Sequence, residues 1–424
     1  MSAYRLIYIY NGRQERIMYM TDDKSIVGKH GYKRWIYVFL GIIIMMFLGT
    51  VYSYSIFRVP IEDLYKVGST LSGLPYMISL ASYAVFMFLA GKILNKYKPK
   101  YIILIGGIVL AVGWLISSIA SNIFILTLTY GLIIGAGVGI IYGVPMHVVA
   151  MWFPDSKGFT VGLVLLGFGL SPLLTAPIVR VLVENFGVMN TFKYLGIFFG
   201  IFITIISFMF MYPSKIVSSD ISSIKSKSTI SKELKPKDMI NSKSFKGLYL
   251  NFTIATMIGL MLIGLTNVIG IKMVGISAAE SALYMSVFAV FNGLGRPTFG
   301  WLTDKYKAKK VMTLSFLLII LAAVNMIFFG AKNNIMYGVS FSIFWFNLGG
   351  WLAIAPTSTI NFYGIKHYTE NYGIVFTGYG VGAVLGVLSS GILVDILGSY
   401  DYVFYYVILL ALLGFILSLK LIKD

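Results

Sequence analysis

Twelve long apolar runs, separated by short polar segments, restrict the fold of this chain more than any other feature. Hydrophobic residues make up 58% of its 424 residues and charged residues only 12%, against about 25% charged in soluble domains. Each run approaches or exceeds the roughly 20 residues that a helix needs to cross a bilayer, and none alternates like a membrane β-strand. We expect an all-α membrane protein with spans near residues 35–57, 72–94, 101–121, 123–150, 159–183, 189–212, 247–270, 277–302, 311–331, 335–360, 371–396 and 401–421.

One basic loop occurs twice. Residues 91–100 read GKILNKYKPK and residues 300–309 read GWLTDKYKAK, so that Gly91 and Gly300 are 209 residues apart, close to half the chain. This repeat predicts two similar six-helix bundles in tandem, the plan of many secondary transporters, whose substrate site lies between the halves. A Ser- and Lys-rich stretch is the predicted linker. We therefore divide the chain into an N-terminal segment 1–34, a first bundle 35–212, a linker 213–246 and a second bundle 247–424.

The basic residues indicate the orientation of the chain. A net charge of +18 is also typical of nucleic-acid-binding proteins, but most Lys and Arg residues of this chain lie in loops on one side, as the positive-inside rule expects. We expect a multi-pass protein of the cell membrane, monomeric in the bilayer, with both termini and the linker in the cytoplasm and no nucleic-acid partner. The opposite side carries a sparser mix of charges: Arg58, Glu62, Asp63, Lys66, Glu184, Lys193, Glu280, Lys332 and Asp401.

The sequence contains no group of residues typical of an enzyme. The absence of cysteine excludes disulfides, thiolate metal sites and cysteine nucleophiles. No Ser-His-Asp grouping, metal-ligand cluster or phosphate-binding loop is apparent. We therefore expect neither an enzyme nor a cofactor or metal site.

Arg296 is the most informative single residue. It lies well inside the eighth run, where a charged side chain costs at least about 2.5–3.5 kcal/mol and tends to be paired or to face an aqueous cavity. The runs carry almost no acid at similar depth. An arginine without a counter-ion favours an anionic substrate, above all a carboxylate, which a guanidinium binds through two parallel hydrogen bonds. The alternative is that Arg296 snorkels to the interface or braces Asp304.

Other polar side chains accompany Arg296. Asn292, one turn earlier, shares its helix face and either binds substrate or holds the arginine. Tyr142 and Tyr379 lie at a similar depth, and Tyr52 is a further candidate. Their hydroxyls can donate to a carboxylate, although packing is an equally simple role. His147 is a candidate proton carrier, or else a hydrogen-bonded interface residue.

The repeated basic loop is a candidate gate. Its members are Gly91 and Asn95 in the first copy and Gly300, Asp304 and Lys305 in the second. Asp304 can face a helix N-terminus, where negative charge is favourable. Asn95 lacks that charge, so the electrostatic attraction between the first copy of the loop and a neighbouring helix should be weaker. The alternative is that the loops only anchor the topology.

Glycine is concentrated in the fourth, fifth and eleventh runs. Small residues allow transmembrane helices to approach closely, and Pro172 and Pro177 in the fifth run allow bending as well. We expect tight helix packing at Gly131, Gly135, Gly137, Gly139, Gly143, Gly162, Gly167, Gly169, Gly373, Gly378, Gly380, Gly382 and Gly386.

Several of these motifs resemble a known family. The segments GAGVGIIYG at 135–143, WFPDSKG at 152–158, GFGL at 167–170, NGLGRP at 292–297, APT at 355–357 and NYG at 371–373 are similar to those of the oxalate:formate antiporter family and its monocarboxylate relatives, in the major facilitator superfamily. The resemblance implies the major facilitator fold and carboxylate transport. It also implies that Arg296 is the substrate arginine of the eighth helix and Tyr142 an aromatic residue of the binding cavity.

One departure from the family pattern bears on the substrate. Oxalate carriers of this family place a lysine on the eleventh helix at the position of Tyr379. Two cations suit a dicarboxylate and one suits a monocarboxylate, so we expect a monoanion such as lactate, pyruvate, formate or acetate. The expected function is secondary active transport by alternating access, with proton symport favoured over exchange of the oxalate:formate type. A transporter-like membrane sensor is a second alternative.

Overall fold

The structure, a computed structural model, describes residues 34–94, 96–153, 157–213, 233–331, 333–364 and 367–422. Asn95, nearly all of the N-terminal segment and residues 214–232 of the expected linker lie outside the described residues. The division into two bundles with the boundaries given above stays a prediction.

Nearly all of the described chain is helical. The first crossing is made of α2 (Trp35–Leu48), the 3₁₀ turn η1 (Gly49–Ser53) and α3 (Tyr54–Tyr65), and the fourth of α6 (Ile123–Leu126), the π-helix η2 (Thr127–Ile134) and α7 (Gly135–Trp152). The other elements are α4 (Ser69–Gly91), α5 (Pro99–Ser117), α8 (Lys157–Met209), α10 (Pro236–Asn241), α11 (Lys243–Ile269), η4 (Gly270–Val274), α12 (Ala278–Tyr306), α13 (Ala308–Asn325), η5 (Met326–Gly330), α14 (Asn334–Tyr363), α15 (Tyr368–Leu397) and α16 (Asp401–Leu421).

Two helices, α8 and α12, account for the difference between ten candidate spans and twelve expected crossings. Ten segments of the described chain are long and apolar enough to span a bilayer. One of them, α8, turns at Gly187, whose φ of 76° and ψ of 169° are not helical, so it crosses twice. α12 is not among the ten segments, because Arg296 and several other polar residues lower its hydropathy. The fold is thus the expected one of twelve membrane helices.

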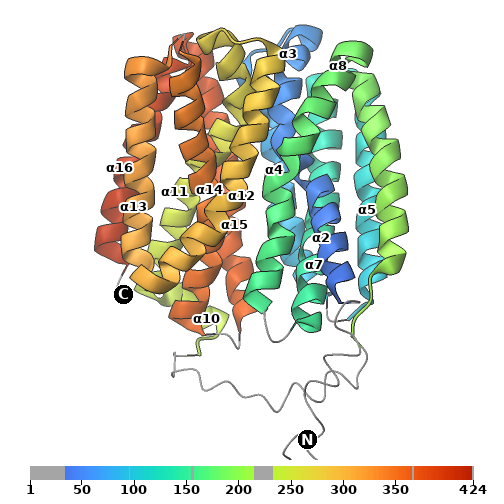
Figure 1. The fold of residues 1–424 in the computed structure, drawn as a ribbon, viewed down its shortest axis with the longest axis vertical. Helices are drawn as coiled ribbons and strands as arrows, with labels where there is room; N and C mark the ends of the chain where they lie inside the picture. The colour runs from blue at the N-terminus through green and yellow to red at the C-terminus, as the bar shows by residue number, and fades with distance from the viewer. Residues whose placement is uncertain are drawn as a thin grey trace, which may run out of the picture.

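The helices gather in two groups. Figure 1 shows α2 to α8, coloured blue to green, on one side of the molecule and α11 to α16, yellow to red, on the other. We call these groups the N half and the C half. They meet where α4 packs against α15 and α8 against α12.

The two ends of the bundle differ in their loops. α2 begins and α16 ends at the lower end in Figure 1, which also carries the loops after α4 and α12. We call this end the basic face, after Lys92, Lys96, Lys98, Lys305 and Lys307. The opposite end, with the turns at residues 66–68, 187, 275 and 398, is the far face.

Close packing between helices depends on glycine at most of the expected positions, but the prediction is wrong for Gly162, where a Cβ would meet nothing within 4 Å. A Cβ at Gly135 of α7 would lie 2.9 Å from the Cα of Ser79 of α4, and one at Gly386 of α15 would lie 3.0 Å from the carbonyl carbon of Met257 of α11. Real Cβ atoms essentially never approach other atoms more closely than 3.0 Å. A side chain at either position would therefore push two helices apart.

Candidate functional site

Arg296 lies between the two halves. Its side chain, on α12 of the C half, is 5% exposed, and its Nη1 donates a hydrogen bond of 2.6 Å to the carbonyl of Leu165 on α8 of the N half. Among the described residues, no acid is hydrogen-bonded or ion-paired to it. Asp304, the partner considered in the sequence analysis, is exposed near the end of α12.

One edge of the Arg296 guanidinium remains unused. Nε and Nη2 are buried and have no hydrogen-bond partner among the described residues. In a planar guanidinium these two nitrogens present parallel N–H bonds on one side, the arrangement that matches the two oxygens of a carboxylate. A buried donor without a partner is costly, so this edge is suited to an acceptor brought by a ligand.

Asn292 supports the arginine on the same helix face. Its Nδ2 donates to the carbonyl of Trp345 at 2.9 Å, while its buried Oδ1 has no partner in the described part of the chain. A free amide oxygen can only accept a hydrogen bond, so it suits a ligand hydroxyl or a shared proton better than a carboxylate oxygen. A Cβ at Gly169 would lie 2.7 Å from this oxygen and 3.4 Å from Nε of Arg296, so glycine leaves both groups uncovered.

Two of the candidate tyrosines meet across the interface between the halves. The hydroxyls of Tyr52, on η1, and Tyr379, on α15, are 3.0 Å apart, and each side chain is 1% exposed. Tyr52 also lies edge-on to Phe168, with ring centroids 5.1 Å apart. Phe168 adjoins Gly169, where a Cβ would lie 3.4 Å from Nε of Arg296. The structure therefore brings Tyr52 and Tyr379 together, near the arginine.

Aromatic rings from both halves surround these hydroxyls. The ring of Tyr142, on α7, lies edge-on to those of Tyr83 and Phe168, with centroids 5.0 and 5.4 Å away. Phe376 of α15 stacks on Tyr379 at 5.0 Å and contacts Tyr83 at 5.7 Å. Tyr83 and Phe376 were missed as candidates, because they stand in apolar runs and carry no motif that separates them from packing residues.

His147 lies apart from this group. It is half-buried on α7 and packs edge-on against Tyr212, with centroids 5.7 Å apart. Within the described ranges, no hydrogen bond or ring contact joins it to Arg296 or to the tyrosine pair. Its role in proton coupling stays a prediction.

The basic loops are exposed. Nζ of Lys305 lies 4.8 Å from the ring centre of Trp301 on its own helix. A Cβ at Gly91 would meet nothing within 4 Å, and one at Gly300 would lie 3.7 Å from Ala353. Neither glycine is thus required for close packing, and the gating role of these loops stays a prediction.

The sequence did not reveal the burial and the pairing of the charged residues at the far face. Arg58 and Glu62, expected among the sparse polar residues of that side, lie within α3 and are 2% and 9% exposed. Glu62 is paired with Lys272 of the C half. A spacing of four residues places Arg58 and Glu62 on one helix face, and this was the only available signal.

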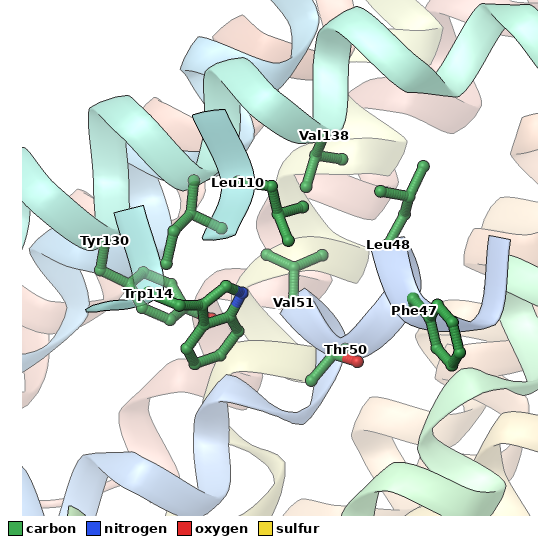
Figure 2. A pocket seen from close by; sticks show the side chains of 9 residues that line it. Phe47, Leu48, Thr50, Val51, Leu110, Trp114, Tyr130 and Val138 are labelled. Atoms are coloured by element: carbon green, nitrogen blue, oxygen red, sulfur yellow. The ribbon is translucent and has the colours of Figure 1, made fainter. Parts of the chain in front are cut away.

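A small crevice lies inside the N half, away from Arg296. Figure 2 shows it among α2, η1, α5, η2 and α7. Its lining is mostly apolar. The hydroxyls of Thr50 and Tyr130 have no hydrogen-bond partner in the described part of the chain, and the crevice has no room for a water molecule. The crevice is therefore a packing defect of the N half rather than a substrate site.

Comparison with known proteins identifies the family. The model of the Major Facilitator Superfamily matches residues 38–362 and 251–424. The chain belongs to this superfamily. It is 26% identical to the oxalate:formate antiporter of Oxalobacter formigenes, over 83% of each chain, and 25% identical to the uncharacterized transporter YhjX of the same superfamily from Escherichia coli K12, over 83% of this chain and 86% of that one.

Further relatives support the same branch. The chain is 27% identical to monocarboxylate transporter 12 of Xenopus laevis, over 73% of this chain and 71% of that one. A crystal structure of a bacterial homologue of the human lysosomal transporter Spinster, inward-facing and occupied, has a TM-score of 0.70 at 13% identity, covering 92% of this chain and 97% of that one. That likeness concerns the fold alone. The chain is thus a multi-pass membrane protein of the Major Facilitator Superfamily, related to the oxalate:formate antiporter and the monocarboxylate transporters.

Proposed function

We propose that this protein is a secondary active transporter of a small monocarboxylate anion such as lactate, pyruvate, formate or acetate. The observation that carries the proposal is the buried edge of Arg296, where Nε and Nη2 have no partner among the described residues. Because this edge matches a carboxylate in charge and shape, an anionic substrate satisfies both donors at once. The substrate lies between the halves, where alternating access needs it.

The choice of a monoanion rests on the surroundings of Arg296. At the position where the family's oxalate carriers have a second cation, this chain has Tyr379, whose hydroxyl pairs with that of Tyr52. A neutral hydroxyl pair offers hydrogen bonds but no second positive charge, so a dicarboxylate would bring one uncompensated charge into a buried site. We assign Arg296, Asn292, Tyr142, Tyr379 and Tyr52 to substrate binding.

Proton symport is the preferred coupling. A monoanion that moves with one proton carries no net charge across the membrane, so it does not work against the membrane potential. The proton travels either on His147 or together with the substrate. Because His147 makes no described contact with the Arg296 group, the second route is favoured.

Anion exchange is the alternative coupling, and it is favoured by the similarity to the oxalate:formate antiporter of Oxalobacter formigenes. An empty site with an unpaired arginine resists reorientation, which would make a return anion obligatory. In either case we place the protein in the cell membrane, with the basic face in the cytoplasm, since Lys and Arg gather there. A membrane sensor would need an output domain, and the expected linker of residues 213–246 is too short for one.

Reconstituted transport tests the proposal. Purified protein in liposomes is given radiolabelled lactate, pyruvate, formate or oxalate, with and without an imposed pH gradient, and with and without unlabelled anion on the opposite side. We expect uptake of a monoanion, stimulated by acid outside. Stimulation only by anion on the opposite side identifies exchange, and transport of oxalate in preference to all monoanions contradicts the proposed substrate class.

A further inference from the structure

The α3–α4 hairpin, residues 62–72, is held at the far face by polar contacts with two segments of the C half. Asp395 of α15 binds the start of α4, and Lys272 of η4 binds Glu62 on α3. Both contacts join residues more than 200 positions apart in the sequence. Neither contact belongs to the Arg296 site or to the basic loops.

Asp395 acts as the helix cap of α4, supplied by the other half. The N-cap residue of α4 is Gly68, which has no side chain to accept hydrogen bonds from the first turn. Instead, Oδ1 of Asp395 accepts from the backbone N–H of Ser69 at 2.8 Å, and Oδ2 accepts from that of Thr70 at 2.9 Å. Its negative charge also lies at the positive end of the helix dipole.

Glycine at residue 68 leaves room for the Asp395 carboxylate. A Cβ at residue 68 would lie 2.8 Å from Oδ1 of Asp395, closer than real Cβ atoms come to other atoms. A serine or aspartate there, the usual N-cap residues, would displace the carboxylate of the other half. With glycine at this position, α4 is capped only while the far face is closed.

The second contact is an ion pair between a buried carboxylate and an exposed ammonium group, since the side chain of Glu62 is 9% exposed and that of Lys272 is 42% exposed. Glu62 accepts from the hydroxyl of Ser72 at 2.8 Å and is 2.5 Å from Nζ of Lys272. Loss of Lys272 would leave the carboxylate of Glu62 poorly solvated, whereas loss of the Glu62 charge removes only the attraction of the pair. Arg58 adds a third connection, since its Nη1 donates to the carbonyl of Gly264 on α11 at 3.1 Å.

We propose that this hairpin is the latch of the far face, with Asp395 as a removable helix cap and Glu62–Lys272 as its ion pair. When the halves part at the far face, α4 loses its cap and Glu62 loses Lys272, while Ser69 and Ser72 stay with Arg58 on the N half. The strength of these contacts therefore sets the balance between the closed and open far face. The inference rests on the alternating access of the proposed function but not on the substrate.

The natural absence of cysteine provides a direct test. Ser55 is fully buried, and its hydroxyl is 3.4 Å from the sulfur of Met285 in the other half, so the variant Ser55→Cys carries one thiol that an open far face would expose. The measured quantity is the rate at which a hydrophilic maleimide labels this thiol in the purified full-length protein in detergent. We expect Asp395→Ala and Glu62→Gln each to raise the rate about fivefold, the effect of losing one cap or one ion pair.

Two further variants separate the latch from general loosening. Glu62→Gln and Lys272→Gln together should raise the rate no more than Glu62→Gln alone, because each variant by itself already removes the ion pair. Gly68→Ala, which displaces Asp395 without removing a charge, should raise the rate and keeps the test valid if Glu62→Gln does not fold.

The far face also offers matched controls. Asp401 binds Ser399 at the start of α16 within the C half, and Arg180 pairs with Glu184 within α8. Asp401→Ala and Arg180→Gln should leave the labelling rate unchanged. An unchanged rate in both Asp395→Ala and Gly68→Ala, or an equal rise in the controls, overturns the latch. Because labelling needs no substrate, its result is independent of whether a monocarboxylate is transported.

Discussion

At the scale of single residues, the proposed function depends on one charge, that of Arg296, which is only partly hydrogen-bonded among the described residues. Arg296 uses Nη1 to bind a backbone carbonyl of the other half and leaves Nε and Nη2 without a described partner. The bond to Leu165 fixes the guanidinium plane, so the free edge points in a defined direction before a ligand arrives. A site prepared in this way loses little entropy on binding.

Arg296→Lys should lower kcat/KM for uptake of the transported monoanion at least tenfold, and Arg296→Ala about a hundredfold or more. Lysine keeps the charge but not the two parallel donors, and alanine removes both. Uptake into liposomes measures these effects, with Arg180→Lys as a control because Arg180 is partly exposed and paired within α8. Uptake by Arg296→Lys equal to that of the wild type would rule out bidentate recognition.

Tyr379→Lys should change the selectivity of the site. It places a second cation near Arg296 and removes the hydroxyl that faces Tyr52, so oxalate should become a competitor of monoanion uptake, with an inhibition constant lowered roughly tenfold or more. Tyr379→Phe removes the same hydroxyl without adding charge and should not gain oxalate inhibition. If both variants respond to oxalate alike, charge at this position does not select the substrate.

At the scale of elements, irregular helices and close crossings place the site residues. Tyr52 is carried by a 3₁₀ turn between α2 and α3, and such turns within a helix often mark functional hinges. α12 and α14 cross where Gly349 faces the carbonyl of Asn292 and Gly295 faces that of Phe346. The position of Asn292 and Arg296 thus depends on one glycine of their own helix and one of the neighbouring helix.

Gly349→Ala should destabilise the protein by about 1–3 kcal/mol or more, because the added methyl group would collide with the backbone of α12 in a packed core. Gly300→Ala is the matched control, since its Cβ would lie at an ordinary 3.7 Å from Ala353. Thermal unfolding in detergent, followed by tryptophan fluorescence, measures the difference. Equal melting temperatures for the two variants would show that the α12–α14 crossing is not tightly packed.

At the scale of the whole molecule, polar contacts between the halves are spread along their interface. They include a hydrogen bond of 3.2 Å from the hydroxyl of Ser286 on α12 to the carbonyl of Leu173 on α8. Arg296 and the Tyr52–Tyr379 pair join the halves around the candidate site, and the hairpin of residues 62–72 joins them at the far face. A ligand that displaces the Tyr52–Tyr379 contact would weaken the central region while the far face stays closed. In the proposed mechanism, binding and reorientation are coupled through contacts that both halves share.

His147→Gln should retain the stimulation of uptake by an inward proton gradient to within about twofold, because the residue packs on Tyr212 and the proton is expected to move with the substrate. The ratio of initial uptake rates with and without the gradient is the measured quantity. Loss of this stimulation with exchange preserved would instead identify His147 as the proton carrier.

The sequence alone determined the fold class and drew attention to Arg296, whose role in substrate binding stays a prediction. Bilayer thickness sets the length of each span and lipid forbids unpaired backbone groups, so apolar runs were enough to locate the helices to within several residues. Among the described membrane helices, only α12 has too low a hydropathy to be assigned as a span by length and composition. Its polar residues include Arg296, which is why the sequence drew attention to that residue. A charge at depth is informative because it is energetically unfavourable wherever it lacks a role.

The tertiary structure decided which side chains meet. Tyr52 and Tyr379 are 327 positions apart, and no local pattern predicts their contact. No motif distinguishes Asp395 in the sequence, yet it caps a helix of the other half, and Arg58 and Glu62 are buried. Contacts across two bundles depend on how packed surfaces fit together in three dimensions, whereas the burial of each span follows from its own residues and the surrounding lipid.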